Sequence, residues 1–362
     1  MNYYEVLDVP RTALREQIRA AYRIQVQLFH PDRLVHSSAT LRAYGEERLK
    51  LINQAYAVLS DPAAKAKYDA ALRAREKSDG HAAPAPAARR PPAPPPPEPR
   101  PARRAVPLAP VRLTLAPGVT LSFVRVPPGE FLMGSDPARD PQARDDEAPL
   151  HRVQLTEYYI SQTPVTNAQY AAFVQASRYA APKRWRNNSI PAGKDQHPVV
   201  AVSWEDAVLF AQWVSRLTRQ LCRLPTEAEW EKAARGTDGR LYPWGNTWDA
   251  RKLNSYEAGP DHTTAVGQYS PAGDSPCGAA DMSGNVQEWC LDWYDPLEYQ
   301  RRGRLAHQPR GPRTGITRVV RGGSFEYYGE AARCACRNDA HPGRHVYSIS
   351  FRLVLLPSLR RP

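Results

Sequence analysis

Residues 81–112 consist almost entirely of proline, alanine and arginine, and this stretch limits what the chain can fold into more than any other feature. It holds 12 of the 36 prolines and no aromatic residue. It therefore cannot bury enough apolar surface to offset the entropy lost on ordering. We expect a disordered, semi-stiff linker of ~3.1 Å per residue where it is extended. A proline-rich ligand for a partner domain, or a basic arm, is the alternative. The linker separates two globular regions, residues 1–80 and 113–362.

The chain lacks the sequence features of a membrane or secreted protein. No segment approaches the ~18–20 consecutive apolar residues that span a bilayer, and the first residues do not combine a basic segment with an apolar one. Five cysteines spread over 362 residues indicate no disulfide framework. We expect a soluble cytoplasmic protein with reduced thiols and no membrane partner.

The net charge of +12 divides into +3 for residues 1–80, +5 for the linker and +4 for residues 113–362. Of the 49 basic residues, 41 are arginine and 8 are lysine. Together with the many alanines and prolines, this indicates the codon bias of a GC-rich genome, and we expect a bacterial source. The charge excess therefore does not predict a nucleic-acid partner.

Apolar residues recur at helical spacing in two stretches of the first 80 residues. One stretch runs over residues 18–28 and stops at His30-Pro31, and the other runs over residues 41–59 and stops before Pro62. This pattern predicts an all-α hairpin joined by a polar turn. Shorter helices are expected beside it, near residues 3–7 and 64–72.

The predicted turn carries His30-Pro31-Asp32, and residues 1–73 resemble the J-domain of DnaJ-type co-chaperones. Four further segments match in family order and spacing: residues 3–7 (YYEVL), 21–23 (AYR), 52–62 (INQAYAVLSDP) and 67–69 (KYD). The resemblance implies contact with a DnaK-type ATPase, whose ATP hydrolysis J-domains accelerate. Asp32 would present its carboxylate to the chaperone, Pro31 would fix the turn and His30 would brace it.

Arg19 and Arg23 precede the His30-Pro31-Asp32 segment and are spaced by one turn of the predicted helix. At this place the family displays a basic face to its acidic partner. A merely solvated helix face is the alternative. Residues 24–28 (IQVQL) carry no lysine, although the family often has lysines there. The basic face is therefore thinner than usual, which favours weaker or more selective docking.

Residues 113–362 contain all 8 tryptophans and many glycines and prolines. Three capping boxes, each a hydroxyl residue followed three positions later by an acid or amide, predict helices over residues 166–176, 203–218 and 226–235. Extended segments at residues 153–155, 317–320 and 351–355 supply strands. This pattern predicts an α+β domain with many irregular loops.

Residues 120–356 resemble the sulfatase-modifying-factor, or formylglycine-generating-enzyme, domain. The matching segments run in family order: residues 126–134 (VPPGEFLMG), 147–153 (EAPLHRV), 164–167 (PVTN), 198–204 (PVVAVSW), 223–231 (RLPTEAEWE), 243–246 (PWGN), 281–289 (DMSGNVQEW), 321–325 (RGGSF) and 350–352 (SFR). This resemblance implies an elaborated C-type-lectin-like fold.

The family resemblance also implies structural calcium. The loop 281–289 would supply main-chain oxygens of Asp281, Gly284 and Val286 and the side chain of Glu288, which are hard ligands suited to Ca²⁺. In the alternative, Glu288 pairs with a basic side chain and Trp289 is core. A possible second calcium site comprises Asn254, Ser255, Asp261 and Thr263.

The enzymes of this family oxidise a protein cysteine with copper held by two cysteine thiolates after the Arg-Gly-Gly-Ser motif. At those offsets this chain has Tyr327 and Ala332, so copper is not expected. Cys334 and Cys336 follow, and in an extended segment both thiols would lie on one face and could hold a soft metal. In the alternative, both cysteines are buried in the core.

Tyr327, Tyr328, His345 and Tyr347 fall where binding proteins of this fold carry their ligand contacts, and they form a possible ligand face. We therefore expect a co-chaperone whose carboxy-terminal domain binds a peptide or protein client and is not an oxidase. Two alternatives stay open: an oxidoreductase acting on protein cysteine through an altered metal site, and a ligand-binding receptor of C-type-lectin-like fold.

Overall fold

The computed structural model describes residues 3–7, 18, 22, 26, 39–78, 110–303 and 305–357. The chain divides into two compact units, Met1–Arg100 and Pro101–Pro362. The predicted disordered linker lies outside the described residues, apart from its last three positions. No helix in the described ranges is long and apolar enough to cross a membrane.

The first unit is helical where it is described, as predicted. It contains α1 (Tyr3–Leu7), α4 (Ala39–Ser60) and α5 (Pro62–Ser78), and residues 18, 22 and 26 are also helical. The carboxylate of Asp61 accepts the Ala64 N–H at 2.7 Å, so it caps α5 one residue after α4 ends. Helix α5 starts before the predicted segment 64–72, because Pro62 is tolerated at its first position, and it also continues beyond that segment to Ser78.

The three helices expected from capping boxes are present: α6 (Asn167–Ser177), α7 (Trp204–Thr218) and α8 (Glu227–Arg235). In each, the hydroxyl of Thr166, Ser203 or Thr226 accepts a backbone N–H three residues on, and the side chain there returns the bond. A short helix, α9 (Glu298–Arg301), follows later in the chain.

Three small sheets complete the second unit. The five-stranded sheet has the order β1 (Val111–Ala116), β2 (Val119–Val126), β5 (Tyr158–Ser161), β12 (Val354–Leu355), β6 (Cys222–Arg223), and its neighbours are antiparallel. The four-stranded sheet has the order β10 (Arg337–Ala340), β9 (Arg318–Arg321), β7 (Gln287–Trp293), β11 (Ile349–Ser350). The third sheet joins β3 (Gly129–Met133), β4 (His151–Leu155) and β8 (Leu305–His307).

The strand predicted over residues 351–355 is shorter than expected, because only residues 354–355 form a ladder. Before them, the Phe351 carbonyl accepts the Val165 N–H and the Leu353 carbonyl accepts the Ser161 N–H. Phe351 and Leu353 are buried in the core. The backbone of this segment is therefore satisfied by the last residue of β5 and by the loop that follows it, rather than by a longer ladder.

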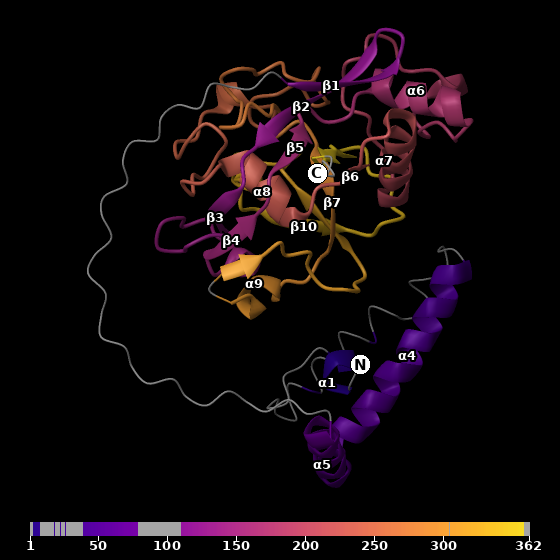
Figure 1. The fold of residues 1–362 in the computed structure, drawn as a ribbon, viewed down its shortest axis with the longest axis vertical. Helices are drawn as coiled ribbons and strands as arrows, with labels where there is room; N and C mark the ends of the chain where they lie inside the picture. The colour runs from indigo at the N-terminus through magenta and orange to yellow at the C-terminus, as the bar shows by residue number, and fades with distance from the viewer. Residues whose placement is uncertain are drawn as a thin grey trace, which may run out of the picture. The chain divides into compact units, whose positions relative to one another are not determined.

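Two hydrophobic clusters hold the second unit together. One contains Phe210 of α7 and Trp289 of β7, and the other contains Trp230 of α8 and Cys334. Figure 1 shows α6 and α7 beside β1 at one end of this unit, and α9 at the other end near β4. Helix α8 and strand β7 pack against each other between these ends, and several charged residues are buried there.

Candidate functional site

The residues predicted to contact a DnaK-type chaperone, His30, Pro31, Asp32, Arg19 and Arg23, all lie outside the described residues. Contacts that hold the surrounding helices together are described. The ring of Tyr22 stacks on that of Tyr56 with centroids 3.9 Å apart, and its hydroxyl donates to Asn53 Oδ1 at 3.1 Å. Tyr3 stacks on Tyr68 of α5 at 4.6 Å. These contacts tie residue 22 to α4 and helix α1 to α5.

Glu288, the side chain predicted to bind calcium, is fully buried on β7 and is engaged by protein donors. Arg352 Nε donates to Glu288 Oε2 at 2.6 Å, and its terminal nitrogen donates to Oε1 at 2.8 Å. Trp230 Nε1 also donates to Oε2, at 2.7 Å. Both carboxylate oxygens therefore already have partners.

The same guanidinium collects the main-chain oxygens beside this loop. Arg352 donates to the carbonyls of Ser161, Ala280 and Asp281 at 3.0, 2.9 and 3.3 Å. The Arg352 guanidinium thus lies where a bound cation would contact the Glu288 carboxylate and the Asp281 carbonyl. Trp289 is a core residue, and both findings agree with the alternative stated from the sequence. The set Asp281, Gly284, Val286 and Glu288 does not fit calcium in this arrangement, because a fixed guanidinium already neutralises its one ionised ligand.

Gly284 has a structural reason to be glycine. Its φ is +76°, and a Cβ at this position would lie 2.4 Å from the Asn254 carbonyl oxygen. The Asn285 N–H donates to the same carbonyl at 2.8 Å. The loop 281–289 therefore packs directly on the segment that carries the possible second calcium site.

That second segment contains buried oxygens without hydrogen-bond partners. They are Asn254 Oδ1, Ser255 Oγ and Thr264 Oγ1. Asn254 Nδ2 donates to the His262 carbonyl at 3.0 Å, and Thr264 N–H donates to Asn285 Oδ1 at 3.0 Å, so the segment folds back around Asn285. Buried unsatisfied oxygens are the atoms that a hard cation can satisfy.

Of the four residues predicted there, Asn254 and Ser255 are buried, Asp261 is exposed, and Thr263 Oγ1 lies 3.1 Å from His197 Nδ1. Thr264 was missed, although its position beside Thr263 could have suggested it. Among the described residues, no group of three or more His, Cys, Asp or Glu is placed to hold a metal ion. Calcium stays a prediction, and the uncharged oxygens of residues 254–264 fit it better than Glu288 does.

The two cysteines proposed as a soft-metal pair do not lie in an extended segment. The backbone turns at residues 334–335, and the Cys336 N–H donates to the Arg333 carbonyl at 3.0 Å. Burial raises the pKa of the Cys334 thiol to about 12 and that of Cys336 to about 11. The extended conformation that the soft-metal pair required is therefore absent, and neutral buried thiols are poor ligands for copper.

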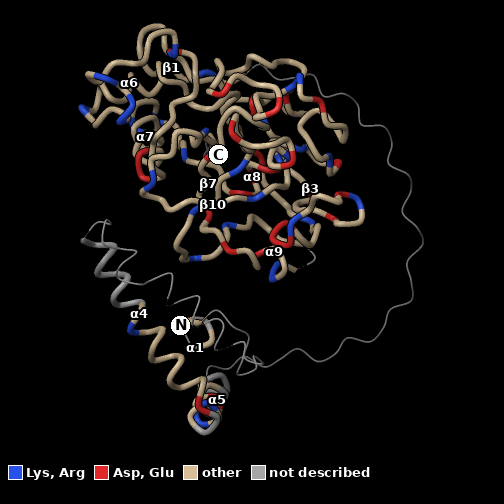
Figure 2. Tube along the Cα trace, turned by 180° about the vertical axis from the view of Figure 1, so that it is seen from behind, with Lys and Arg blue, Asp and Glu red and all other residues tan. Residues whose placement is uncertain are grey.

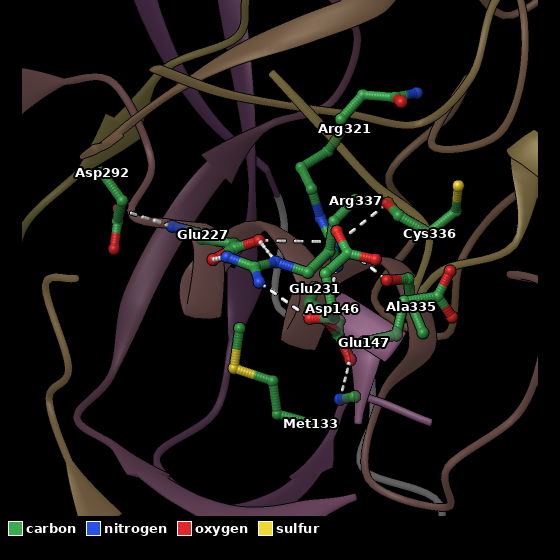
Figure 3. Close-up of polar contacts among 12 residues, drawn as sticks. Met133, Asp146, Glu147, Glu227, Glu231, Asp292, Arg321, Ala335, Cys336 and Arg337 are labelled. Atoms are coloured by element: carbon green, nitrogen blue, oxygen red, sulfur yellow. Dashed lines mark hydrogen bonds and ion pairs between the residues drawn. The ribbon is translucent and has the colours of Figure 1, made fainter. Parts of the chain in front are cut away.

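The carbonyls of this turn converge on a buried charge network that the sequence did not reveal (Figure 3). Arg321 donates to the carbonyls of Cys334, Ala335 and Cys336 at 2.8–2.9 Å and pairs with Glu231. Further ion pairs surround it: Arg337 with Glu227, Arg235 with Glu231, and Arg333 with Glu147 and Asp140. Figure 2 shows acidic and basic residues interspersed around α8 and α9.

This network holds the segment 333–337 through the buried ion pairs of Arg333 and Arg337. Removing one partner of a buried, hydrogen-bonded ion pair costs about 3–5 kcal/mol. The desolvation cost of burying Arg321, Arg333 and Arg337 is offset by carboxylate partners that lie 90 to 193 positions away in the chain. Tyr327 and Ala332, at the offsets of the family's copper ligands, carry no thiol, so the described residues do not fit copper.

The residues of the possible ligand face fall into two neighbourhoods. Tyr327 and Tyr328 lie beside Tyr256: the Tyr256 N–H donates to the Tyr327 carbonyl at 3.1 Å, and the rings of Tyr256 and Tyr328 are 4.9 Å apart. Tyr347 donates its hydroxyl to Glu326, next to Tyr327. His345 points elsewhere and lies 3.3 Å from the carboxylate of Asp206 on α7.

Tyr256, Tyr327, Tyr328 and Tyr347, which we call the tyrosine face, are all well exposed. The exposed fractions of Tyr256 and Tyr328 are 54% and 57%. The backbone beneath them is held, because Glu257 accepts the Gly329 N–H at 2.9 Å and the Trp248 ring packs on Gly329. Exposed aromatic rings on a fixed backbone are suited to stacking against a bound chain. Sequence reasoning missed Tyr256, which lies 71 positions before Tyr327.

Comparison with known families and proteins agrees with both resemblances. Residues 116–356 match the family described as sulfatase-modifying factor enzyme 1-like domain, and residues 2–69 match the DnaJ domain. The chain is 36% identical over 293 residues to the formylglycine-generating enzyme of Streptomyces coelicolor, covering 65% of this chain and 90% of that enzyme. It is 33% identical over 273 residues to the hercynine oxygenase of Mycolicibacterium thermoresistibile, covering 66% of this chain and 59% of the oxygenase.

Two solved structures share the fold of the second unit. Treponema denticola variable protein 1 aligns with a TM-score of 0.59 at 24% identity and covers 68% of this chain and 99% of its own. PvdO from Pseudomonas aeruginosa aligns with the same TM-score and identity and covers 68% and 98%. The C-type-lectin-like architecture predicted from the sequence is thereby confirmed.

Proposed function

Because the chain belongs to the sulfatase-modifying-factor family over residues 116–356 and carries a DnaJ domain over residues 2–69, we propose that it is a co-chaperone. The DnaJ domain recruits a DnaK-type ATPase and stimulates its ATP hydrolysis. The carboxy-terminal domain binds a peptide or protein client and delivers it to the ATPase. A DnaK-type partner follows from the DnaJ domain, whereas the client role rests on the tyrosine face.

The tyrosine face carries the client part of the proposal. Tyr327 stands at the offset where the family's enzymes have a copper thiolate, and with Tyr256 and Tyr328 it presents aromatic rings to solvent. Burying such a ring removes apolar area worth about 25 cal/mol per Å² from water. The position that serves chemistry in the enzymes is thus available for binding in this chain.

A mechanism without a redox step follows from these parts. An exposed segment of an unfolded client stacks on the tyrosine face, while the DnaJ domain contacts the ATPase. ATP hydrolysis then closes the ATPase on the same client, which the linker keeps within reach. The linker raises the effective concentration of the client at the ATPase.

Aggregation of chemically denatured citrate synthase, followed by light scattering with the full chain present, tests the client part. We expect the wild-type protein to slow aggregation and the double variant Tyr256→Ser, Tyr328→Ser to lose most of this effect. Both side chains are exposed, so their replacement should change stability by no more than about 0.5 kcal/mol.

Leu221→Ser is the matched control, because Leu221 is 61% exposed but lies next to β6 at the edge of the five-stranded sheet. It should behave like the wild type. Stimulation of a DnaK-type ATPase should be the same in all three proteins. Equal protection of citrate synthase by the wild type and the double variant would overturn the client role and leave the DnaJ assignment intact.

A further inference from the structure

Asp292 is a buried carboxyl group that takes part in none of the roles described above. It lies on β7 and is 2% exposed. Its Oδ2 accepts the N–H of Glu227 at the start of α8, at 2.8 Å, whereas its Oδ1 is buried without any hydrogen-bond partner. Figure 3 shows it beside the charge network, linked to the network only through Glu227.

The cations nearest to Asp292 each hydrogen-bond to another group, although Arg302 Nη2 and Arg318 Nε are buried without a partner. Arg223 makes a two-pronged pair with Glu229 at 2.6 and 2.7 Å. Arg302 donates to Glu298 at 3.2 Å, and Arg318 donates to the Leu291 carbonyl at 2.5 Å. No described guanidinium therefore hydrogen-bonds to Asp292.

The remaining titratable neighbours disfavour a negative charge at Asp292. Glu227 is held ionised by Arg337, with a pKa of about 2, and Glu229 is paired with Arg223. Burial keeps the pKa of the Cys290 thiol well above its ordinary value, so this neighbour stays neutral. Burial, followed by repulsion from Glu227, raises the pKa of Asp292 to about 7.

Residues 308–317, which we call the strap, cover Asp292 and its neighbour Trp293. Gly311 has a φ of +64°, and a Cβ there would lie 3.0 Å from Asp292 Oδ1. A Cβ at Gly315 would lie 2.7 Å from the Trp293 side chain. After the strap, the Arg318 guanidinium sits between Trp204 and Trp293, 3.8 and 3.5 Å from the ring centroids.

The strap is attached at its two ends. The Gln308 N–H donates to the Gln154 carbonyl at 3.0 Å, and the Thr317 carbonyl accepts the Tyr294 N–H at 2.8 Å. Within the described chain, residues 309–316 make no hydrogen bond to any other residue. Between its ends the strap is therefore held by its packing on Asp292 and Trp293.

We propose that the strap is a pH-sensitive cover, closed while Asp292 is protonated and opened when Asp292 loses its proton. An ionised Oδ1 under Gly311 would have no donor, and a buried carboxylate without donors is costly. Water can supply the missing donors only if the strap moves, because the charge network holds α8 and the hydrogen bond from Trp230 to Glu288 joins α8 to β7. Opening thus exposes the Asp292 and Trp293 edge of β7 above neutral pH.

Protonation of Asp292 favours the closed strap. A carboxyl group whose pKa is raised in the closed state binds its proton more tightly there than in the open state. Its contribution to closure is complete below about pH 4, the ordinary pKa of aspartate, and is lost as the pH rises through 7. Between pH 6 and pH 8 the equilibrium constant for opening should rise about tenfold.

Amide hydrogen exchange of the full chain tests this directly. The Tyr294 and Gln308 amides donate the hydrogen bonds at the two ends of the strap. Their protection factors, corrected for intrinsic exchange, should therefore fall about tenfold from pH 6 to pH 8. In Asp292→Asn, which has no proton to lose, these two values should be independent of pH. Asp295→Asn, a charge removal three residues along the same segment, should keep the wild-type dependence.

A flat profile in the wild type, or an unchanged slope in Asp292→Asn, would overturn the proposal. If Asp292→Asn does not fold, as judged by circular dichroism, the side-chain carboxyl of Asp292 can be followed by carbon NMR in the wild-type chain. A titration midpoint near 7 supports the proposal, and a midpoint near 4 contradicts it.

Discussion

Arg352 and Glu288, 64 positions apart, form a two-pronged ion pair in which both side chains are fully buried. The pair joins β7 to the last core segment of the chain, and Arg352 also gathers carbonyls from two loops. A cation is thus built into the protein at the loop where the family resemblance implied calcium.

Glu288→Gln and Arg352→Met should each lower the free energy of unfolding of the carboxy-terminal domain by about 3–5 kcal/mol, because each leaves a buried charge without its partner. The double variant Glu288→Gln, Arg352→Met should lose less than the sum of the two single losses. Urea unfolding followed by tryptophan fluorescence measures this in the full chain, since every tryptophan lies beyond residue 113. Additive losses would contradict the coupling.

Calcium should stabilise the same domain through residues 254–264 rather than through Glu288. A ligand that binds the folded state adds about 2.7 kcal/mol at 100 times its Kd. We expect calcium to raise the Tm seen by tryptophan fluorescence relative to EDTA, and Asn254→Ala to abolish that rise. Glu288→Gln should lower the Tm in both buffers and keep the rise. A rise that disappears in Glu288→Gln and survives in Asn254→Ala would assign calcium to the loop 281–289 instead.

No formylglycine should form on a cysteine peptide, even after copper loading and in the presence of oxygen. Tyr327 and Ala332 provide no thiolates, and burial raises the pKa of Cys334 and Cys336 far above neutrality. Mass spectrometry of the peptide, with hydrazide capture of any aldehyde, is the measurement. Turnover that vanishes in the double variant Cys334→Ser, Cys336→Ser would establish the oxidoreductase alternative.

Asp32→Asn should abolish stimulation of a DnaK-type ATPase, because the amide loses the charge-assisted contact while it keeps the side chain's size. Circular dichroism should show the helices unchanged. Asp61→Asn makes the same chemical change at the cap of α5, where asparagine is also a good cap, and should stimulate normally. Full stimulation by Asp32→Asn would sink the co-chaperone assignment.

The features that could be predicted from the sequence are those determined by residues close together in the chain. The capping boxes of Thr166, Ser203 and Thr226 each need partners only three residues away, so the starts of α6, α7 and α8 were predicted correctly. The end of α4 at Ser60 followed from Pro62 in the same way. Both domain resemblances rest on such local motifs read in order.

The tertiary structure decided which distant groups satisfy one another. The sequence showed Glu288 in a motif, but only the fold brings Arg352 to it, and only the fold places Tyr256 beside Tyr328. The turn at residues 334–335 is likewise dictated by Arg321, whose buried guanidinium needs the carbonyls of Cys334 and Cys336. A buried charge or carbonyl must find a partner wherever the chain supplies one. That partner depends on the path of the whole chain, and no local pattern in the sequence specifies it.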